Sequence, residues 1–307
     1  MRQKRLFLFI LLSLGAGFIL YLGQRYYTEF QEDKKQQLLY EKRKASWQDL
    51  KQKLTTERCQ FKGEVGIVVK DLQTFQGLYY GKDDPFPSAS LVKIPIMAVC
   101  FLAAEEGKIK LDRKVALKSS DKFSGSGILK DTRIGTTFTV EELIGLMIYD
   151  SDNTATNMLT NMVGIDYLNN AFNSFGLKNT KLSRKVADFS LRDRGIENYT
   201  TAEDMTLILE KMYRRVLVSE NVSDKCLKLL KLQRINDRIP KYLPVDVTVA
   251  HKTGLESSVC HDAGIVFTCK GNFLIVVLTK HANSDSAPSK EFIAKVAMYV
   301  YKYFEQL

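Results

Sequence analysis

The order of its predicted elements most constrains how this chain can fold. Segments with strand character come first, GEVGIVVKDL and QGLYYG, and again near the end, VDVTVAHKTG, DAGIVFTCK and NFLIVVLTK. The long middle has helical periodicity, and the last segment, SKEFIAKVAMYVYKYFEQ, is an amphipathic helix that needs a sheet face to cover. This order predicts one α+β domain with two lobes, in which the termini meet in a mixed sheet beside a helical lobe.

A run without charges comes before this domain. Residues 6–23, LFLFILLSLGAGFILYLG, would rise about 27 Å as a helix, close to the hydrocarbon thickness of a bilayer. Basic residues crowd positions 2–5, so the positive-inside rule places the N-terminus in the cytoplasm. A cleaved signal peptide is the alternative, but bulky Tyr21 and Tyr26 lie where small residues would be needed.

Four segments follow from these patterns. We expect a cytoplasmic basic tail at 1–5, a transmembrane anchor at 6–23, a charged helical stalk at 24–57 and one folded domain at 58–307. The domain would then lie outside the cytoplasm, either in a periplasm or on the outer face of the membrane.

Composition excludes several classes of function. The formal net charge is +10, which suits a protein facing anionic lipid and cell-wall polymer. Basic residues are not interleaved with aromatic ones in one patch, so nucleic acid is not a predicted partner. The three histidines and five cysteines complete no zinc motif, so neither a structural nor a catalytic metal is predicted. The odd number of cysteines leaves at least one unpaired.

The first chemical motif is Ser90-Leu91-Val92-Lys93 at the start of an apolar helix. Positions i and i+3 share a helix face, so Lys93 can reach Ser90 and, with a pKa lowered by burial, accept its proton. The motif alone is weak, because it occurs by chance about once in 300 residues. A second copy begins at Ser119, but it lies in a polar stretch and opens no apolar helix.

The second motif is Ser151-Asp152-Asn153, directly after a predicted helix. The Ser151 hydroxyl can pass a proton to a leaving nitrogen, and the Asn153 amide can bind a substrate carbonyl and hold Lys93. In isolation the same three residues are equally typical of a helix cap or a turn.

The third motif, Lys252-Thr253-Gly254, ends a predicted strand. Lys252 and the Thr253 hydroxyl suit a substrate carboxylate, and Gly254 lets a substrate backbone approach closely. The N–H of Leu255 can join that of Ser90 in an oxyanion hole.

Together, the three motifs are very improbable by chance. Their order and their spacings of 61 and 101 residues resemble class A β-lactamases and the related D-alanyl-D-alanine peptidases. The resemblance covers roughly residues 60–305 and extends to PFPSASLVKIPIM, GSGIL, LMIYDSDNTATN and VAHKTG. It implies a five-stranded antiparallel sheet flanked by terminal helices and an all-helical lobe, with no cofactor and no metal.

The resemblance also implies a role for each motif residue. Ser90 is acylated, Lys93 activates it and Ser151 carries the proton to the leaving amine. The implied catalytic residues are Ser90, Lys93, Ser151 and Lys252, and the implied substrate-binding residues are Asn153, Thr253, Gly254 and Leu255.

One position departs from the class A pattern. Those enzymes hydrolyse the acyl-enzyme with a glutamate two residues after a loop arginine, which corresponds to Arg184, so the glutamate position falls on Val186. Asp188 is the candidate replacement base, although it can equally be a loop carboxylate paired with Arg184 or Arg192. A second departure is the absence of arginine from HDAGIVFTCK, where Asp262 lies instead.

These observations predict an acyl-serine hydrolase that acts on β-lactams or peptidoglycan stem peptides and deacylates slowly, as penicillin-binding enzymes do. The first alternative is a true class A β-lactamase that uses Asp188 or another carboxylate. The second alternative is a non-hydrolytic module that binds the cell wall.

Overall fold

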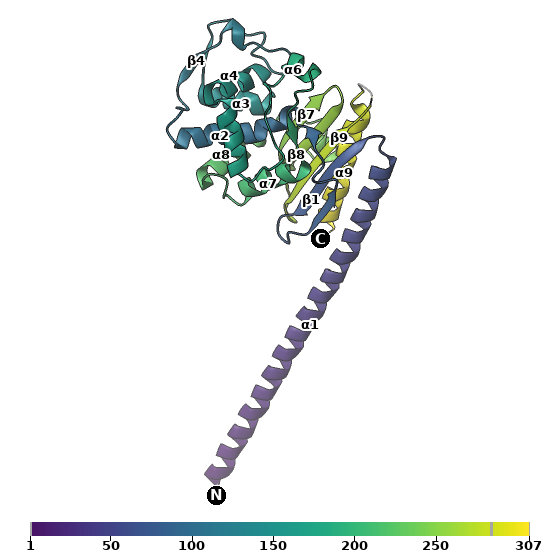
Figure 1. The fold of residues 1–307 in the computed structure, drawn as a ribbon. Coiled ribbons are helices and arrows are strands. Elements are labelled where there is room, and N and C mark those ends of the chain that lie inside the picture. Colours follow the sequence, from purple (N-terminus) through teal and green to yellow (C-terminus); the bar gives the residue numbers. More distant parts are fainter. Residues whose placement is uncertain (1, 283–284, 307) are drawn as a thin grey trace. The chain divides into compact units, whose positions relative to one another are not determined.

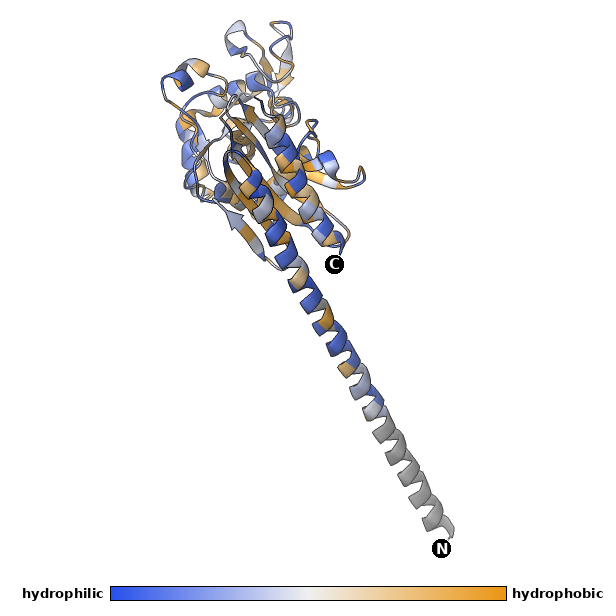
Figure 2. Cartoon of the chain, turned by 90° about the vertical axis from the view of Figure 1, so that its right-hand side faces the viewer, coloured by the Kyte–Doolittle hydropathy of each residue, from blue (hydrophilic) through white to orange (hydrophobic). Residues whose placement is uncertain are grey.

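The computed structural model describes residues 2–282 and 285–306, with backbone alone at residues 2–20, 36 and 39. Its first element, α1 (Arg2–Gln60), is a helix that includes the predicted stalk. From residue 21 to 52 this helix is mainly hydrophilic (Figure 2). The predicted membrane segment, 6–23, also falls in α1, but its side chains up to residue 20 lie outside the described part. Among the residues that were described, no helix has the length and apolarity needed to cross a membrane.

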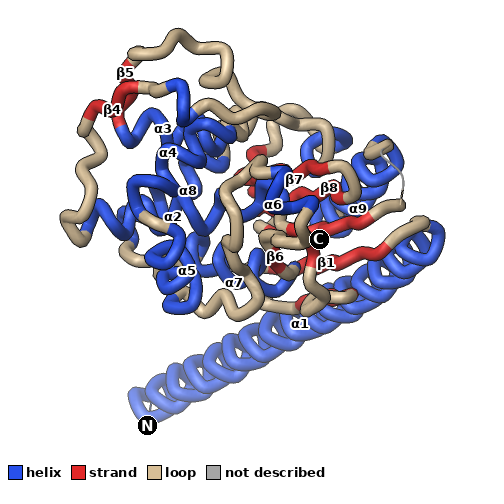
Figure 3. Tube along the Cα trace, turned by 45° about the horizontal axis from the view of Figure 1, so that its top comes forward, coloured by secondary structure: helices blue, strands red, loops and turns tan. Residues whose placement is uncertain are grey.

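The chain divides into two units, one ending at Gln52 and the other comprising Lys53–Gln306. The second unit contains one large sheet, which is seen beside its helices in Figures 1 and 3. In spatial order its strands are β2 (Gly77–Tyr80), β1 (Glu64–Asp71), β9 (Phe273–Lys280), β8 (Val259–Phe267) and β7 (Thr248–Glu256).

Every strand pair in this sheet is antiparallel. The prediction of a mixed sheet was therefore wrong, and the antiparallel sheet implied by the resemblance is correct. The reason lies in the connections, because hairpins join β1 to β2, β7 to β8 and β8 to β9, and a hairpin reverses the chain. The first and last strands then meet with Glu64 opposite Lys280 and Asp71 opposite Phe273.

A turn at Lys270-Gly271-Asn272 joins β8 to β9. Gly271 has φ +139°, in the region that favours glycine. The Thr268 N–H donates to Asn272 Oδ1 at 3.1 Å, and the Thr268 hydroxyl donates to the Gly271 carbonyl at 2.7 Å. These bonds close the hairpin and fix the register of β8 and β9.

Strand β9 shows how the sheet separates two layers. Successive side chains of a strand point to opposite faces. Leu274, Val276 and Leu278 belong to the core shared with the helical lobe. Phe273 instead stacks on Phe304 of α9 (Ala287–Glu305), with ring centroids 4.9 Å apart. The terminal helix therefore covers one face, and the helical lobe packs on the other.

In sequence, the helical lobe lies between strands β2 and β7. Its helices are α2 (Lys93–Glu105), α3 (Val140–Tyr149), α4 (Asn153–Val163), α5 (Ile165–Ser174), α6 (Phe189–Asp193), α7 (Ala202–Tyr213) and α8 (Glu220–Leu230). Two small sheets pair β3 (Phe86–Pro87) with β6 (Tyr199–Thr200) and β4 (Lys114–Ala116) with β5 (Thr137–Thr139). Short 3-10 turns are η1 (Ala89–Val92), η2 (Ser119–Asp121) and η3 (Ile239–Tyr242).

A capping box opens α3. The Glu142 N–H donates to Thr139 Oγ1 at 3.1 Å, and the Thr139 N–H donates to Glu142 Oε2 at 2.7 Å. Two backbone donors at the helix start are thereby satisfied. The capping box fixes where α3 begins. The C-terminal end of α3 in turn positions the segment that contains Ser151.

Candidate active site

Ser90 lies in the 3-10 turn η1, and the α-helix that follows begins at Lys93. The sequence had placed Ser90 in the first turn of the α-helix itself, so the boundary is three residues later than predicted. The Lys93 N–H donates to the Ser90 carbonyl, which holds the two residues on one turn. Ala89 has φ +43°, a conformation that L-residues rarely adopt and that often marks functional sites. In the described part of the chain, the partly exposed Ser90 side chain makes no hydrogen bond.

Lys93 is fully buried and donates three hydrogen bonds through its Nζ. The acceptors are the Ser151 carbonyl at 2.6 Å, Ser151 Oγ at 3.1 Å and Asn153 Oδ1 at 2.8 Å. Burial lowers the pKa of Lys93 to about 7, against the opposing charges of Asp152 and Glu256. Lys93 therefore exists in part as a neutral amine near neutral pH, and a neutral amine can accept a proton.

The segment around Ser151 is held by a loop that precedes it. Asn153 Nδ2 donates to the Ser124 carbonyl at 3.0 Å, while Asn153 Oδ1 accepts a hydrogen bond from Lys93 Nζ. Asp152 accepts the N–H groups of Leu129 and Ala155, both at 2.8 Å. These contacts join the GSGIL loop to the start of α4 and orient the oxygen that holds Lys93.

Lys252, which lies on the sheet, also contacts the Ser151 hydroxyl. It is fully buried, and its Nζ donates to Ser151 Oγ at 3.0 Å and to the Thr253 carbonyl at 2.9 Å. Burial lowers the pKa of Lys252 well below its ordinary value, and the nearby charge of Lys93 lowers it further. A hydroxyl has two lone pairs and one hydrogen, so with both lysines donating to Ser151 Oγ its hydrogen points elsewhere.

Strand β7 is the outermost strand of the sheet and presents one unpaired edge to the site. The Thr253 carbonyl that receives Lys252 points to this edge, and by the two-residue repeat of a strand so does the N–H of Leu255. Opposite Gly254 lies Ala89, because a Cβ added to this glycine would be 3.4 Å from the Ala89 Cβ. The turn that carries Ser90 therefore packs against the strand that carries the third motif.

The structure thus brings Lys93, Ser151, Asn153 and Lys252 into direct contact and places Ser90 one turn from Lys93. Thr253, Gly254 and Leu255 line the adjoining strand edge. The chemical roles of these eight residues remain predictions.

Asp188 has a structural role in a loop. Its Oδ1 accepts the Leu191 N–H at 3.2 Å and caps α6. Arg184 pairs instead with Glu197 and Glu256, at 2.6 and 3.4 Å. No hydrogen bond or ion pair between described residues joins Asp188 to a motif residue. Its predicted part in deacylation stays a prediction without contacts to support it.

Sequence reasoning missed a buried polar cluster behind the third motif. His251 Nδ1 lies 2.9 Å from Asp262 Oδ1, and Asp262 Oδ2 accepts the Ile239 N–H at 3.0 Å. Arg238, only 2% exposed, lies close enough for its charge to lower the pKa of Lys252. No arginine was expected to support Lys252, and since Arg238 comes from a separate loop, motif spacing gave no signal for it.

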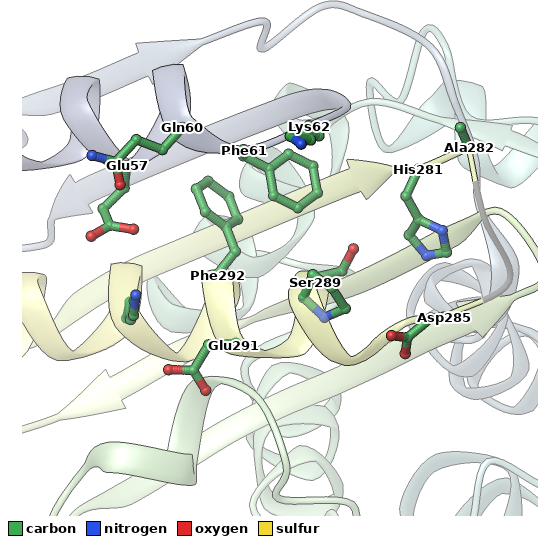
Figure 4. Close-up of a pocket in the computed structure, with 12 residues that line it drawn as sticks. Glu57, Gln60, Phe61, Lys62, His281, Ala282, Asp285, Ser289, Glu291 and Phe292 are labelled. Atoms are coloured by element: carbon green, nitrogen blue, oxygen red, sulfur yellow. The ribbon is translucent and has the colours of Figure 1, made fainter.

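A cavity of about 570 Å³ lies apart from this site. Figure 4 shows Phe61 and Phe292 in its wall, with ring centroids 4.7 Å apart, near His281 and Asp285. No motif residue lines this cavity. Within the described residues, no group of three or more His, Cys, Asp or Glu side chains is placed to hold a metal ion.

Comparison with known proteins places this arrangement in a family. A family model described as the beta-lactamase enzyme family matches residues 49–304. Extended-spectrum beta-lactamase PER-1 of Pseudomonas aeruginosa is 25% identical over 256 residues, covering 79% of this chain and 83% of the relative. Beta-lactamase VEB-1 of the same organism is 22% identical over 258 residues, covering 78% and 85%.

Solved structures of other proteins have the same fold. A beta-lactamase from Sphaerobacter thermophilus superimposes with a TM-score of 0.77 at 27% identity, covering 85% of this chain and 98% of that one. The structure of PBP-A superimposes with a TM-score of 0.78 at 28% identity, covering 84% and 97%. With the fold, the three converging motifs and a match over most of its length, the chain belongs to the beta-lactamase enzyme family of serine hydrolases.

Proposed function

We propose that this protein forms an acyl-enzyme at Ser90 with β-lactams or with D-alanyl-D-alanine-type cell-wall peptides. The observation that carries the proposal is the convergence of two buried lysines on the Ser151 hydroxyl, one turn from Ser90. Two buried ammonium-type groups this close are unfavourable for folding, so their retention points to chemistry.

Each group has a step in acylation. Neutral Lys93 takes the proton of Ser90 as its Oγ attacks the carbonyl carbon, and the N–H groups of Ser90 and Leu255 stabilise the oxyanion. Ser151 then gives its hydroxyl hydrogen to the leaving nitrogen as the C–N bond breaks, and it regains a proton from Lys93 or Lys252. Lys252 and Thr253 hold the substrate carboxylate.

The fate of the acyl-enzyme depends on a base that is missing from the matching position of the loop. Val186 stands at the position of the class A glutamate, and loss of a general base commonly slows a step by about 10² to 10⁴-fold. A single-residue variant of PBP-A, the protein that superimposes well here, forms an acyl-enzyme complex with penicillin G. We therefore favour slow deacylation, as in penicillin-binding enzymes, over fast turnover as in a true β-lactamase.

The proposal extends to the place of action. The uncharged run at 6–23 is long enough to span a bilayer as a helix, and the basic residues before it favour a cytoplasmic N-terminus. The enzyme domain would then work outside the cytoplasm, where cell-wall peptides and β-lactams are found.

Nitrocefin tests the proposal. The wild-type protein should open about one equivalent in a rapid burst, followed by a much slower steady rate. Ser90→Ala should abolish both phases, whereas Ser119→Ala, which removes the serine of the second S-x-x-K copy, should change neither. Many rapid turnovers would favour the β-lactamase alternative. A complete lack of reaction with any β-lactam would favour the non-hydrolytic module.

A further inference from the structure

The loop that should carry the hydrolytic glutamate cannot supply its carboxylate at the matching position. Val186 is 5% exposed, and its carbonyl accepts Asn157 Nδ2 at 2.8 Å, which fixes the backbone there. Asp188, nearby in the loop, caps α6 through Oδ1, and it is not among the charges that shift the pKa of Lys93. A carboxylate from another element that lies closer to Lys93 is therefore the stronger candidate for the base that hydrolyses the acyl-enzyme.

A second carboxylate approaches this loop from the sheet. Arg184, whose side chain is 1% exposed, donates through Nη2 to Glu197 Oε1 at 2.6 Å and to Glu256 Oε2 at 3.4 Å. Glu197 belongs to the loop, but Glu256 is the last residue of β7. One guanidinium therefore faces two carboxylates, and Glu256 has the longer contact.

Glu256 shares a strand face with the third motif. Side chains at positions i, i+2 and i+4 of a strand lie on the same side, so Glu256 projects to the side of Lys252 and Gly254. This side faces the helical lobe, because Ala250 on the same face belongs to the lobe's core and Gly254 faces Ala89. Glu256 also lies close enough to Lys93 for its charge to raise the pKa of that amine.

One oxygen of Glu256 remains available. Its Oε2 contacts Arg184, and among described residues the side chain makes no other hydrogen bond or ion pair. The side chain is only 15% exposed, so it is shielded from bulk solvent but still reachable by a water molecule. A carboxylate with one oxygen anchored and the other open is suited to accept a proton from water.

We propose that Glu256 is the general base for hydrolysis of the acyl-enzyme, replacing the loop glutamate from the end of strand β7. This inference rests on the proposed function, because it requires an acyl group on Ser90. It names the carboxylate through which the slow deacylation would proceed.

The chemistry balances without a further reagent. Glu256 takes a proton from water as the water oxygen bonds to the acyl carbon, and the carbonyl electrons move to the oxyanion. Collapse of the tetrahedral intermediate breaks the bond between the acyl carbon and Ser90 Oγ. Glu256 returns its proton, through Lys93 or solvent, to the serine oxygen, which leaves the free enzyme and a carboxylic acid.

The electrostatics of the site agree with this role. Burial raises the pKa of Glu256, Arg184 lowers it and Glu197 raises it, with a net upward shift. A base whose pKa is closer to the working pH accepts a proton more readily. The deacylation rate should therefore rise with pH through the raised pKa of Glu256.

The test follows the decay of the adduct and not its formation. Wild type and Glu256→Gln are loaded with benzylpenicillin, excess antibiotic is removed by rapid desalting, and the adduct is followed by intact-mass spectrometry at several pH values. We expect Glu256→Gln to acquire the adduct, which shows that it is folded. We expect it to lose the adduct at least about 10²-fold more slowly, without the inflection in pH.

Glu197→Gln is the matched control. It removes the shorter ion pair of the same arginine, at 2.6 Å, and leaves Glu256 in place. If Glu256 acts as a base, the Glu197→Gln adduct should decay at close to the wild-type rate. If Glu256 merely holds Arg184, Glu197→Gln should slow decay as much as Glu256→Gln does, and this result would overturn the proposal.

Two further outcomes distinguish a failure of the base assignment from a failure of the proposed function. An adduct on Glu256→Gln that decays at the wild-type rate overturns the assignment of the base and leaves the proposed function standing. A wild-type protein that never acquires an adduct overturns the proposed function, and the assignment of the base with it.

Discussion

At the scale of single residues, the site holds two ionisable lysines in a buried environment that disfavours their charged forms. Lys93 and Lys252 are both fully buried in low-dielectric surroundings, and both donate to Ser151 Oγ. Their lowered pKa values follow from this burial, because a buried ammonium loses its hydration. The same burial that would destabilise a structural lysine gives Lys93 the lowered pKa that the proposed role as a base requires.

This assignment predicts how acylation depends on pH. Lys93 must be neutral to accept the Ser90 proton, and its pKa is about 7. The acylation rate should therefore rise as pH increases through about 7 and level off above it. Stopped-flow mixing with nitrocefin across this range measures it.

Lys93→Arg provides the control, because a guanidinium stays protonated throughout this range. It should acylate at least about 10²-fold more slowly at every pH. An unchanged rate and an unchanged pH profile in Lys93→Arg would show that another group is the base.

At the scale of elements, the loop at 124–129 and the start of α4 act together. Gly127 has φ +105°, and a Cβ added there would overlap the carboxyl group of Asp152. Asp152 caps α4 and accepts the Leu129 N–H at 2.8 Å. The neighbouring Asn153 holds Lys93, so a disturbance of Asp152 should reach the site.

Gly127→Ala should consequently lower both stability and acylation. The strained backbone alone costs about 1 to 3 kcal/mol, and the overlap adds to it. Thermal unfolding and the acylation rate are the measurements. Gly107→Ala is the matched control, because Gly107 also has positive φ, +72°, but has open space around it. Equal losses of stability and activity in the two variants would contradict the role given to Asp152.

The sequence specified some elements of this site better than others. The three motifs predicted which side chains converge, because each motif is a short pattern that is visible in the sequence itself. Ser90 was placed in an α-helix and lies in a 3-10 turn, and this turn packs against Gly254 through Ala89, a contact between distant segments. Arg238 and Glu256 were missed, because their relation to the site depends on contacts between elements distant in sequence.

At the scale of the whole molecule, the antiparallel sheet explains why one chain can carry three motifs to one place. Strand β1 pairs with β9, which joins the two ends of the domain in one sheet. The helical lobe, inserted in sequence between β2 and β7, packs on one face of this sheet. The first two motifs come from the lobe and the third from the edge strand. The strand–helix–strand order predicted this arrangement, although it did not fix the strand directions.

The predicted anchor can be tested on the full chain. If residues 6–23 span a membrane, the protein expressed in bacteria should sediment with membranes and resist extraction by high salt but not by detergent. Deletion of residues 1–23 should release it to the soluble fraction with nitrocefin reactivity intact. Full-length protein recovered in the soluble fraction without detergent would contradict the anchor.

The central claim is that Ser90 is the nucleophile of a single site built from all three motifs. Intact-mass spectrometry of the protein after exposure to benzylpenicillin, followed over time, tests it most directly. The account predicts one added penicilloyl mass that persists after the antibiotic is removed and that is absent from Ser90→Ala. A Ser90→Ala protein that gains the same mass at the wild-type rate would contradict it.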